Sequence, residues 1–338
     1  MAVDVDTEAR AADGAAVPEE IKGRSLSAIA WGRFRRDKTA MVALGVLIFL
    51  LACALFAPLI TNLLGLDPYS LNPDAISAEN GGVPNGCGLP DSSFFCGLSW
   101  QHPFGVEPGT GRDLLARLLY GLRISLFIAF SATTITVLLG TMFGIVSGYL
   151  GGRTDAVIGR LMDLILSFPT LLIILALSGV LTQRLEAMGV PEGNPARITY
   201  LILVLSVFGW PYLARIVRGQ VLSVREREFV EAAIAMGSGT RRILFKEILP
   251  NLWAPIMIYA TLTLPTYIAT EAVLSFLGVG VLPPTPTFGA ILADSVSYMN
   301  IIPSYLLIPG VLLALVVVTF NLVGDSVRDA LDPRAGRV

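Results

Sequence analysis

Long apolar runs separated by shorter polar segments occupy most of this chain. A helix needs about 20 residues to cross the hydrocarbon core of a bilayer, and six of the runs are long and apolar enough to do so. They are Ala40–Ile60, Ile124–Tyr149, Ala156–Leu181, Ile198–Leu213, Leu252–Leu277 and Ile302–Val323. Because the runs are continuous rather than alternating, transmembrane strands are a poor alternative. The pattern predicts an all-α membrane protein whose six transmembrane helices occupy residues 39–330.

The composition is typical of a protein with a lipid-facing surface. Charged residues make up 15% of the 338 residues and the mean hydropathy is +0.70, whereas soluble domains carry about 25% charged residues. The net charge of −2 gives no basic field, so we expect no nucleic-acid partner. Residues 1–24 open with an Ala-, Asp- and Glu-rich stretch that has no apolar core. This segment is expected to be a disordered cytoplasmic tail and not a signal peptide.

The distribution of Lys and Arg predicts the orientation of the bundle. Six spans place both termini on one side of the membrane. If that side is the cytoplasm, only five of the 24 basic residues lie outside, namely Arg112, Arg117, Arg123, Arg184 and Arg197. The excess on the inner side is what the positive-inside rule describes. Both termini, including the short tail 331–338, are therefore expected to be cytoplasmic.

Residues 25–38 precede the first span and combine apolar positions with a basic end. Leu26, Ile29, Ala30 and Phe34 fall near helical spacing. An interfacial amphipathic helix on anionic membrane lipids fits this pattern. An ordinary positive flank of a transmembrane span fits it equally well.

The polar segment 222–250, between the fourth and fifth spans, has a helical pattern of its own. One face combines apolar and small residues at i, i+3, i+4 and i+7, namely Phe229, Ala232, Ala233 and Met236. Gly237 is expected to end this helix, Thr240 to cap a second short helix that starts at Arg241, and Pro250 to stop it. The spacing alone fits a docking surface and a solvated amphipathic loop equally well.

The same segment resembles the signature loop of ABC-importer permease subunits. The matching residues are Glu231, Ala232, Ala233, then Gly237 after three residues, and later Leu249 and Pro250. The resemblance implies a coupling helix that sits in a cleft of an ATPase subunit. One position departs from the family, because Glu247 stands where an apolar residue is usual, two positions before the Leu-Pro pair. Ile248 follows directly, so a shifted contact is an open alternative.

Further segments are similar to the C-type permeases of dipeptide and oligopeptide importers. They start at His102 (HPFG), Gly111 (GRD), Arg117 (RLLYGLRIS), Gly278 (GVGVLPPTPTFG) and Asn321 (NLVGDSVRDALDP), so the resemblance covers about residues 31–333. It implies the type I ABC-importer transmembrane-domain fold in a bacterial inner (plasma) membrane. It also implies a pore subunit that pairs with a second, homologous permease to form a heterodimer. Two ATPase subunits, which bind the ATP and Mg, and an extracytoplasmic substrate-binding protein would complete the complex.

The competing functional class is a stand-alone secondary transporter or channel. Such proteins often show internal repeats and charged sites at the membrane midplane. We find no convincing internal repeat, and a single carboxylate deep in the spans gives little support for ion coupling. The importer is therefore the leading interpretation.

The chemistry of an enzyme is not apparent in this sequence. No Gly-x-x-x-x-Gly-Lys-Ser/Thr run occurs, so the chain is not expected to bind ATP itself or to hold another cofactor. His102 is the single histidine, and without a Cys/His cluster we expect a structural turn and no metal. We therefore expect a pore subunit that is not an enzyme by itself.

Cys87 and Cys96 both fall in the predicted external loop 61–121. An extracytoplasmic compartment is oxidising, so a disulfide between them is predicted. The loop looks longer than is usual in the family, chiefly around residues 80–101. This insertion either contacts a binding protein or the partner permease, or has no function of its own. Cys53 is expected to be a packing residue of the first span.

Two acidic residues lie in predicted spans, where ionisable groups are costly and often functional. Asp163 is near the cytoplasmic end of the third span and could pair with Arg160 or a basic loop residue. Glu271 is deeper, and either lines a pathway or holds helices together, with the structural role favoured. Pro169 and Pro211 are expected to kink their spans.

Overall fold

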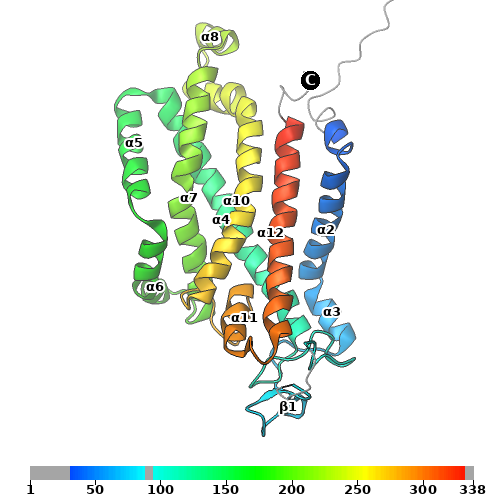
Figure 1. The fold of residues 1–338 in the computed structure, drawn as a ribbon. Helices are drawn as coiled ribbons and strands as arrows, with labels where there is room; N and C mark the ends of the chain where they lie inside the picture. The colour runs from blue at the N-terminus through cyan, green and yellow to red at the C-terminus, as the bar shows by residue number, and fades with distance from the viewer. Residues whose placement is uncertain (1–30, 88–93, 332–338) are drawn as a thin grey trace, which may run out of the picture.

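The computed structural model describes residues 31–87 and 94–331. Its long helices run side by side, with a layer of loops at one end of the bundle and the short helix α8 at the other (Figure 1). The expected tail 1–24 and nearly all of the expected tail 331–338 lie outside the described residues.

Most of the expected interfacial helix 25–38 also falls outside the described part of the chain. Within that part, residues 31–34 are helical. Phe34 is buried there against Ala40 and Ala330, so the end of this segment packs onto both α2 and α12.

Six helical stretches among the described residues are long and apolar enough to cross a bilayer, which confirms the predicted fold class. They are Lys38–Leu55 (α2), Leu114–Leu150 (α4), Thr170–Ala187 (α6), Asn194–Val224 (α7), Thr240–Phe276 (α9, η2, η3 and α10) and Pro303–Leu331 (α12). Shorter helices between them are α3 (Ala57–Leu64), α5 (Gly152–Ser167), α8 (Glu228–Ala235) and α11 (Phe288–Ser295). The start of α2 and the end of α12 lie at the end of the bundle that carries α8 (Figure 1).

The predicted third span is wrong as a single helix. The run Ala156–Leu181 is divided between α5, which ends at Ser167, and α6, which begins at Thr170. Pro169 has no N–H to donate, and its ring disfavours a helical conformation at the preceding residue, so Phe168 is extended with ψ 138°. Pro169 therefore separates two helices rather than kinking one.

The predicted fourth span is too short at both ends. It was expected over Ile198–Leu213, but α7 runs over Asn194–Val224 with Pro211 inside a continuous helix. Polar residues after Leu213 looked like a loop in sequence. The helix continues because Ala214, Val217 and Val221 are buried at helical spacing against α4. Arg215 and Arg218 stand on another face of it, and each pairs with a carboxylate of the neighbouring α5.

α4 is the central helix of the bundle. It packs against α2, α7 and α10, and buried side chains of all these helices and of α12 form one continuous apolar core. Its approach to α7 is closest along a row of glycines, Gly140, Gly144 and Gly148, which stand at helical i, i+4, i+8 positions on the face towards α7. Small residues at this spacing let two transmembrane helices pack with their backbones close together.

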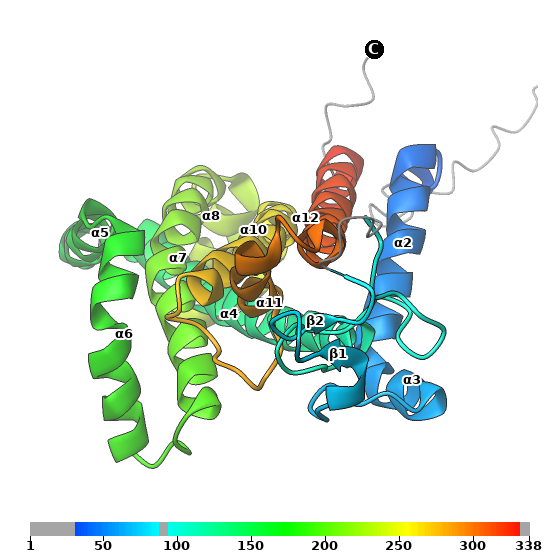
Figure 2. The same cartoon turned by 60° about the horizontal axis from the view of Figure 1, so that its bottom comes forward.

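The external loop is shorter than predicted, because α3 extends to Leu64 and α4 begins at Leu114. It contains the turn η1 (Pro73–Ala75) and two short antiparallel strands, β1 (Ile76–Ser77) and β2 (Val83–Pro84). Figure 2 shows these strands over the start of α4, on the side of the molecule away from α5 and α6.

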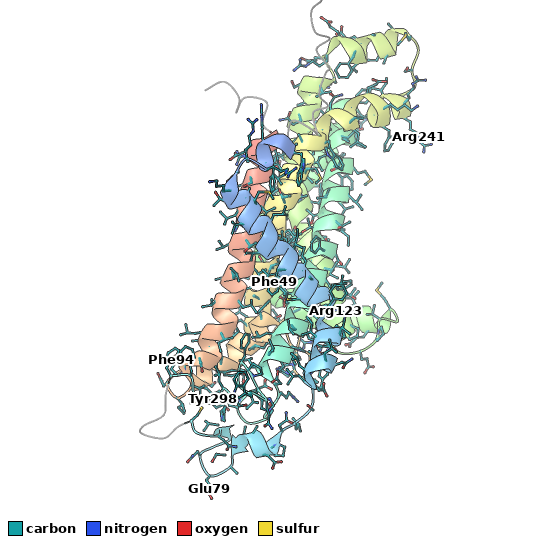
Figure 3. The ribbon with its side chains drawn as sticks, turned by 90° about the vertical axis from the view of Figure 1, so that its right-hand side faces the viewer. Phe49, Glu79, Phe94, Arg123, Arg241 and Tyr298 are labelled. Atoms are coloured by element: carbon teal, nitrogen blue, oxygen red, sulfur yellow. A yellow bond between two sulfur atoms is a disulfide. The ribbon has the colours of Figure 1, made fainter. Side chains whose placement is uncertain are left out.

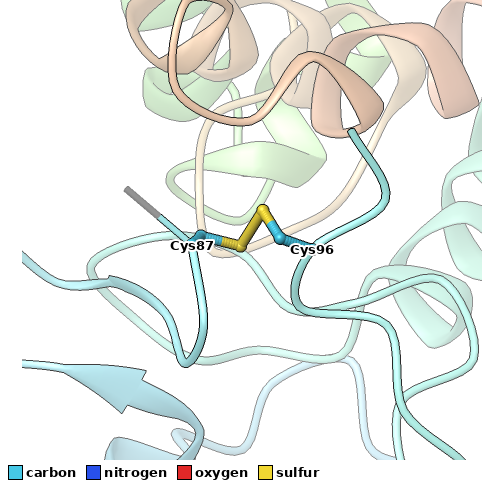
Figure 4. Close-up of a disulfide and its surroundings, with 2 residues drawn as sticks. All are labelled: Cys87 and Cys96. Atoms are coloured by element: carbon cyan, nitrogen blue, oxygen red, sulfur yellow. A yellow bond between two sulfur atoms is a disulfide. The ribbon is translucent and has the colours of Figure 1, made fainter. Parts of the chain in front are cut away.

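A disulfide joins Cys87 and Cys96, the pair that the sequence predicts, and their Cα atoms are 5.2 Å apart (Figure 4). His102, which the sequence analysis assigns to a structural turn, also contacts a specific side chain. Its Nδ1 lies 2.9 Å from Oδ2 of Asp113, whose other carboxylate oxygen accepts the Ala116 backbone N–H at 2.7 Å and so caps α4.

An arginine network fixes this loop to the bundle. The buried guanidinium of Arg117 in α4 donates to the carbonyl oxygens of Pro68 and Pro284 and pairs with Glu107 at 3.3 Å. One side chain thus joins α4, the external loop and the segment before α11. The result is a loop layer held to the helices at several points.

Candidate functional site

The segment between α7 and α10 forms two short helical arms across one end of the bundle. α8 is the first arm, and the second begins with α9 (Thr240–Arg242) and continues as the π-helical stretch η2 (Ile243–Ile248). Figure 3 shows the arm that carries Arg241 at the opposite end of the molecule from Glu79 in the external loop. The two arms are therefore exposed where a partner on this side of the membrane could reach them.

Gly237 ends the first arm, as the sequence predicts. Its backbone N–H bonds to the Ile234 carbonyl at 2.9 Å, and the Ser238 N–H bonds to the Ala233 carbonyl at 3.0 Å. This pair of bonds is a Schellman motif, and it requires the left-handed φ of +78° that Gly237 adopts.

The exposed face of α8 differs from the predicted one. Ala233 is buried together with Val230, and both pack against the chain itself. Phe229, Ala232 and Met236 remain exposed, as does Glu231. Val230 and Ala233, three residues apart, thus form the face that packs on the rest of the chain. The face predicted from the sequence is divided, because Ala233 is buried and its other three residues are exposed.

The second arm begins and ends differently from the prediction. Gly239 occupies the N-cap position, and Thr240 is the first helical residue and makes no side-chain cap. Pro250 does not end the helix, because Leu249 and Pro250 lie in a 3-10 turn, η3 (Leu249–Leu252), that leads directly into α10 (Trp253–Phe276). Proline is tolerated at this position since the first N–H groups of a new helical turn have no partner within it.

The π-helical stretch accounts for the unusual Glu247. A π turn contains one extra residue and so rotates the side chains that follow it. Ile248 is fully buried while Glu247 is partly exposed, so the apolar contact falls one residue later than in the family pattern. The structure supports the shifted contact that the sequence left open.

Both arms are joined to the bundle by one apolar cluster. Val230 and Ala233 of α8 pack with Ile243 and Ile248 of η2, and the same cluster includes side chains of α4, α7 and α10. The additional members are Ile145, Leu213, Val217, Val221, Leu252 and Ile256. A force on the exposed face of α8 would therefore be transmitted to three membrane-spanning helices.

A polar clamp lies beside this cluster. Arg218 of α7 donates to both oxygens of Asp155 at 2.6 Å, and Ser147 of α4 donates to the same carboxylate at 2.5 Å. The Arg218 hydrogen bonds and then that of Ser147 lower the pKa of Asp155 to about 2. Asp155 is thus ionised at neutral pH and joins α4, α5 and α7. Sequence inspection missed it, because it precedes the predicted third span and its partner follows the predicted fourth.

Of the two partners that the sequence left open for Asp163, the structure has the basic residue from the predicted loop and not Arg160. Its Oδ1 lies 2.7 Å from an amino nitrogen of Arg215 on α7, and no hydrogen bond or ion pair to Arg160 is present in the described part of the chain. Both side chains are more than half exposed. Arg215 also lines a cavity of about 700 Å³ between α6, α7 and α10.

Glu271 is fully buried in α10 and does not line that cavity. Its carboxylate accepts hydrogen bonds from Ser125 of α4 at 2.6 Å and from Ser275 at 2.7 Å. These contacts agree with the favoured structural role, in which Glu271 holds α4 and α10 together.

Comparisons with known proteins agree with this architecture. Residues 140–337 match the family model of the binding-protein-dependent transport system inner membrane component, and residues 25–80 match the N-terminal TM domain of oligopeptide transport permease C. The oligopeptide transport system permease protein OppC of Bacillus subtilis is 35% identical over 96% of this chain and 95% of the relative. The dipeptide transport system permease protein DppC of Alkalihalophilus pseudofirmus is 35% identical over 90% of this chain and 89% of the relative.

The fold has a counterpart among solved structures. An inward-facing structure of the MetNI methionine ABC transporter superposes with a TM-score of 0.51 at 21% identity, over 64% of this chain and 96% of that chain. At this identity the likeness concerns the fold alone, and it agrees with the expected importer transmembrane domain. The chain belongs to the family of inner-membrane components of binding-protein-dependent transport systems, in the branch of the oligopeptide and dipeptide permeases.

Proposed function

We propose that this chain is the pore-forming permease subunit of an ATP-driven peptide importer and that α8 is its ATPase-docking element. Relatives that match nearly the whole chain are named as oligopeptide and dipeptide transport permeases, which supports the peptide substrate class. The observation that carries the docking role is the position of α8. Phe229, Ala232 and Met236 are exposed on it, while its opposite face is buried in the bundle.

The orientation follows from charge. Arg227, Arg241, Arg242 and Lys246 all lie at the end of the chain's membrane domain that carries α8, which fits a cytoplasmic location by the positive-inside rule. In this orientation the disulfide-bonded loop faces the extracytoplasmic side, where a substrate-binding protein would dock. Two ATPase subunits would bind ATP and Mg, and a second, homologous permease would complete the pore.

The packing suggests how ATP would drive transport. When the ATPase subunits close, the exposed face of α8 moves with them. The apolar cluster behind α8 and the clamp at Asp155 would carry this displacement into α4, α7 and α10. These packed helices would then switch between two arrangements, so that the pore opens first to one side of the membrane and then to the other.

The docking role is tested by placing a charge on the exposed face. Ala232→Asp is expected to abolish co-purification with the ATPase subunits and substrate-stimulated ATP hydrolysis, because it puts a carboxylate in an apolar contact. Ala78→Asp is the matched control, since Ala78 is also an exposed alanine but lies in the external loop at the other end of the molecule. Retention of both activities in Ala232→Asp would refute the docking role.

The same preparation tests the transport class. Proteoliposomes with the complete complex are expected to accumulate a labelled tripeptide only with ATP inside and the binding protein outside. Uptake by this chain alone, driven by an ion gradient, would instead establish a secondary transporter.

A further inference from the structure

A charged pair is exposed on α5 and α7, next to the cavity described above. Arg215 of α7 and Asp163 of α5 are 2.7 Å apart, and their side chains are 54% and 68% exposed. Arg215 lies within α7, one of the helices long and apolar enough to cross a bilayer. Charged side chains of membrane-spanning helices face a bundle interior or a water-filled space, not lipid. This face of α7 therefore borders an aqueous path or a partner subunit.

The cavity beside the pair has the size of a small-ligand site. Its volume is about 700 Å³, within the range of roughly 300–1,000 Å³ found for ligand pockets. It lies between α6, α7 and α10, and Arg215 is its one charged lining residue. Arg215 also lines a smaller adjoining hollow of about 350 Å³, which contains Asp163 and Arg160. The ion pair thus stands where the two spaces meet.

The remaining wall of the cavity offers few free hydrogen-bonding groups. The Thr266 hydroxyl donates to the Leu262 carbonyl at 3.1 Å, and the Thr270 hydroxyl donates to the Thr266 carbonyl at 2.7 Å. Tyr259 donates to the Gly209 carbonyl at 3.3 Å. With these donors occupied, and with the hydroxyls of Thr170 and Tyr212 as further polar groups on the wall, most of the lining is methyl groups and aromatic rings. Such a wall can pass many kinds of side chain but does not recognise any of them strongly.

We infer that Arg215 leaves Asp163 and binds the C-terminal carboxylate of the transported peptide, so that one carboxylate partner replaces another. This inference rests on the proposed function. Arginine suits a carboxylate because it can bind both oxygens. Asp163, whose side chain is 68% exposed, then remains solvated. Recognition of the carboxylate alone leaves the peptide side chains free to vary.

The neighbouring clamp between Arg218 and Asp155 is a structural ion pair and differs from the Asp163–Arg215 pair. Arg218 holds Asp155 with two hydrogen bonds, Ser147 adds a third, and the two charged side chains are only 35% and 23% exposed. The Asp163–Arg215 pair has a single contact and greater exposure. Exposed ion pairs are weak, so this pair can open for a ligand while the clamp remains closed.

The experiment uses the complete importer complex in nanodiscs without the binding protein. Cys53→Ala removes the free thiol, and Thr266→Cys places a reporter on the exposed cavity wall. Millimolar trialanine is expected to slow alkylation of this cysteine at least threefold. Trialanine amide, which lacks the carboxylate, is expected to protect much less. Arg215→Gln should remove the protection by trialanine, and Arg215→Lys should restore part of it.

Arg160→Gln is the matched control, because Arg160 is exposed in the smaller hollow but does not line the large cavity. It should leave the protection by trialanine unchanged. Protection that persists in Arg215→Gln, that is equal for trialanine and its amide, or that is lost equally in Arg160→Gln would overturn the inference, as would no protection at all.

Uptake by the wild-type complex separates this inference from the proposed function. If ATP-dependent uptake of trialanine occurs but the protection fails as described, only the role of Arg215 is refuted. If no peptide uptake occurs with the binding protein and ATP present, the proposed function itself fails.

Discussion

Three glycines of α4 determine how closely this helix approaches α7. A Cβ atom on Gly144 would lie 2.7 Å from the Ala214 carbonyl oxygen and equally close to Cβ of Val217. Cβ atoms on Gly140 and Gly148 would meet Leu213 and Val221 at 2.7 and 2.8 Å. These distances leave no room for any side chain. Glycine is required here for close contact of two helices and not for an unusual φ.

Gly144→Ala is therefore expected to lower the free energy of unfolding by about 1–3 kcal/mol, the usual cost of overpacking a dense interior. Gly219→Ala on α7 is the matched control, because a Cβ there meets nothing within 4 Å. It should be neutral or stabilising by up to about 1 kcal/mol, since alanine has the better helix propensity. Apparent melting temperatures in one detergent compare the two variants, and equal shifts would contradict the role of Gly144.

At the scale of elements, the two arms between α7 and α10 are more than a loop between spans. The helical backbone continues from Thr240 to Phe276 through α, π and 3-10 turns, so the second arm leads into α10 without a loop. α8 is held against the second arm by Val230 and Ala233. The arms are thus connected to the membrane helices both by the backbone and by packing.

The π-helical register gives a direct prediction for two adjacent residues. Ile248→Ala is expected to cost about 2–5 kcal/mol of stability, because Ile248 is fully buried and its loss leaves a cavity. Glu247→Ala should change stability by less than about 0.5 kcal/mol, as surface substitutions generally do. If Glu247→Ala were instead the more damaging of the two in thermal unfolding, Glu247 would occupy the inward position and the register shift would be refuted.

At the scale of the whole molecule, the two surfaces that we assign to partners lie at opposite ends. Glu79 is in the external loop and Arg241 is on the second arm, and Figure 3 shows the length of the bundle between them. A permease that connects an extracytoplasmic binding protein to a cytoplasmic ATPase requires this separation.

Single-cysteine labelling in intact cells tests the orientation. In a Cys53→Ala background, Glu79→Cys is expected to react with a membrane-impermeant maleimide from outside, since the residue is exposed there. Arg241→Cys should react only after the membrane is permeabilised. Cys87 and Cys96 stay silent because they form a disulfide. The reverse labelling pattern would show that the bundle has the opposite orientation.

The sequence by itself determined the membrane class, the six spans and the family. The length of a continuous apolar run can be compared with the thickness of a bilayer, and this comparison needs no other part of the chain. Helix ends were predicted less well, because the charges of Arg215 and Arg218 made this stretch of α7 look like a loop, while its buried residues Val217 and Val221 pack on α4, a distant part of the chain. The glycine stop at Gly237 was local and was predicted correctly.

Only the tertiary structure decided which predicted site residues act together. Ala233 and Phe229 share a face by helical spacing, yet one is buried and the other exposed, because the second arm that packs against α8 comes from later in the chain. Asp163 and Glu271 were equivalent in sequence as acidic residues within spans. The fold buries Glu271 between hydroxyl groups of two helices and exposes Asp163 beside Arg215 and the cavity. Local composition determines whether a segment enters the membrane, but contacts between distant helices determine which of its charges face water.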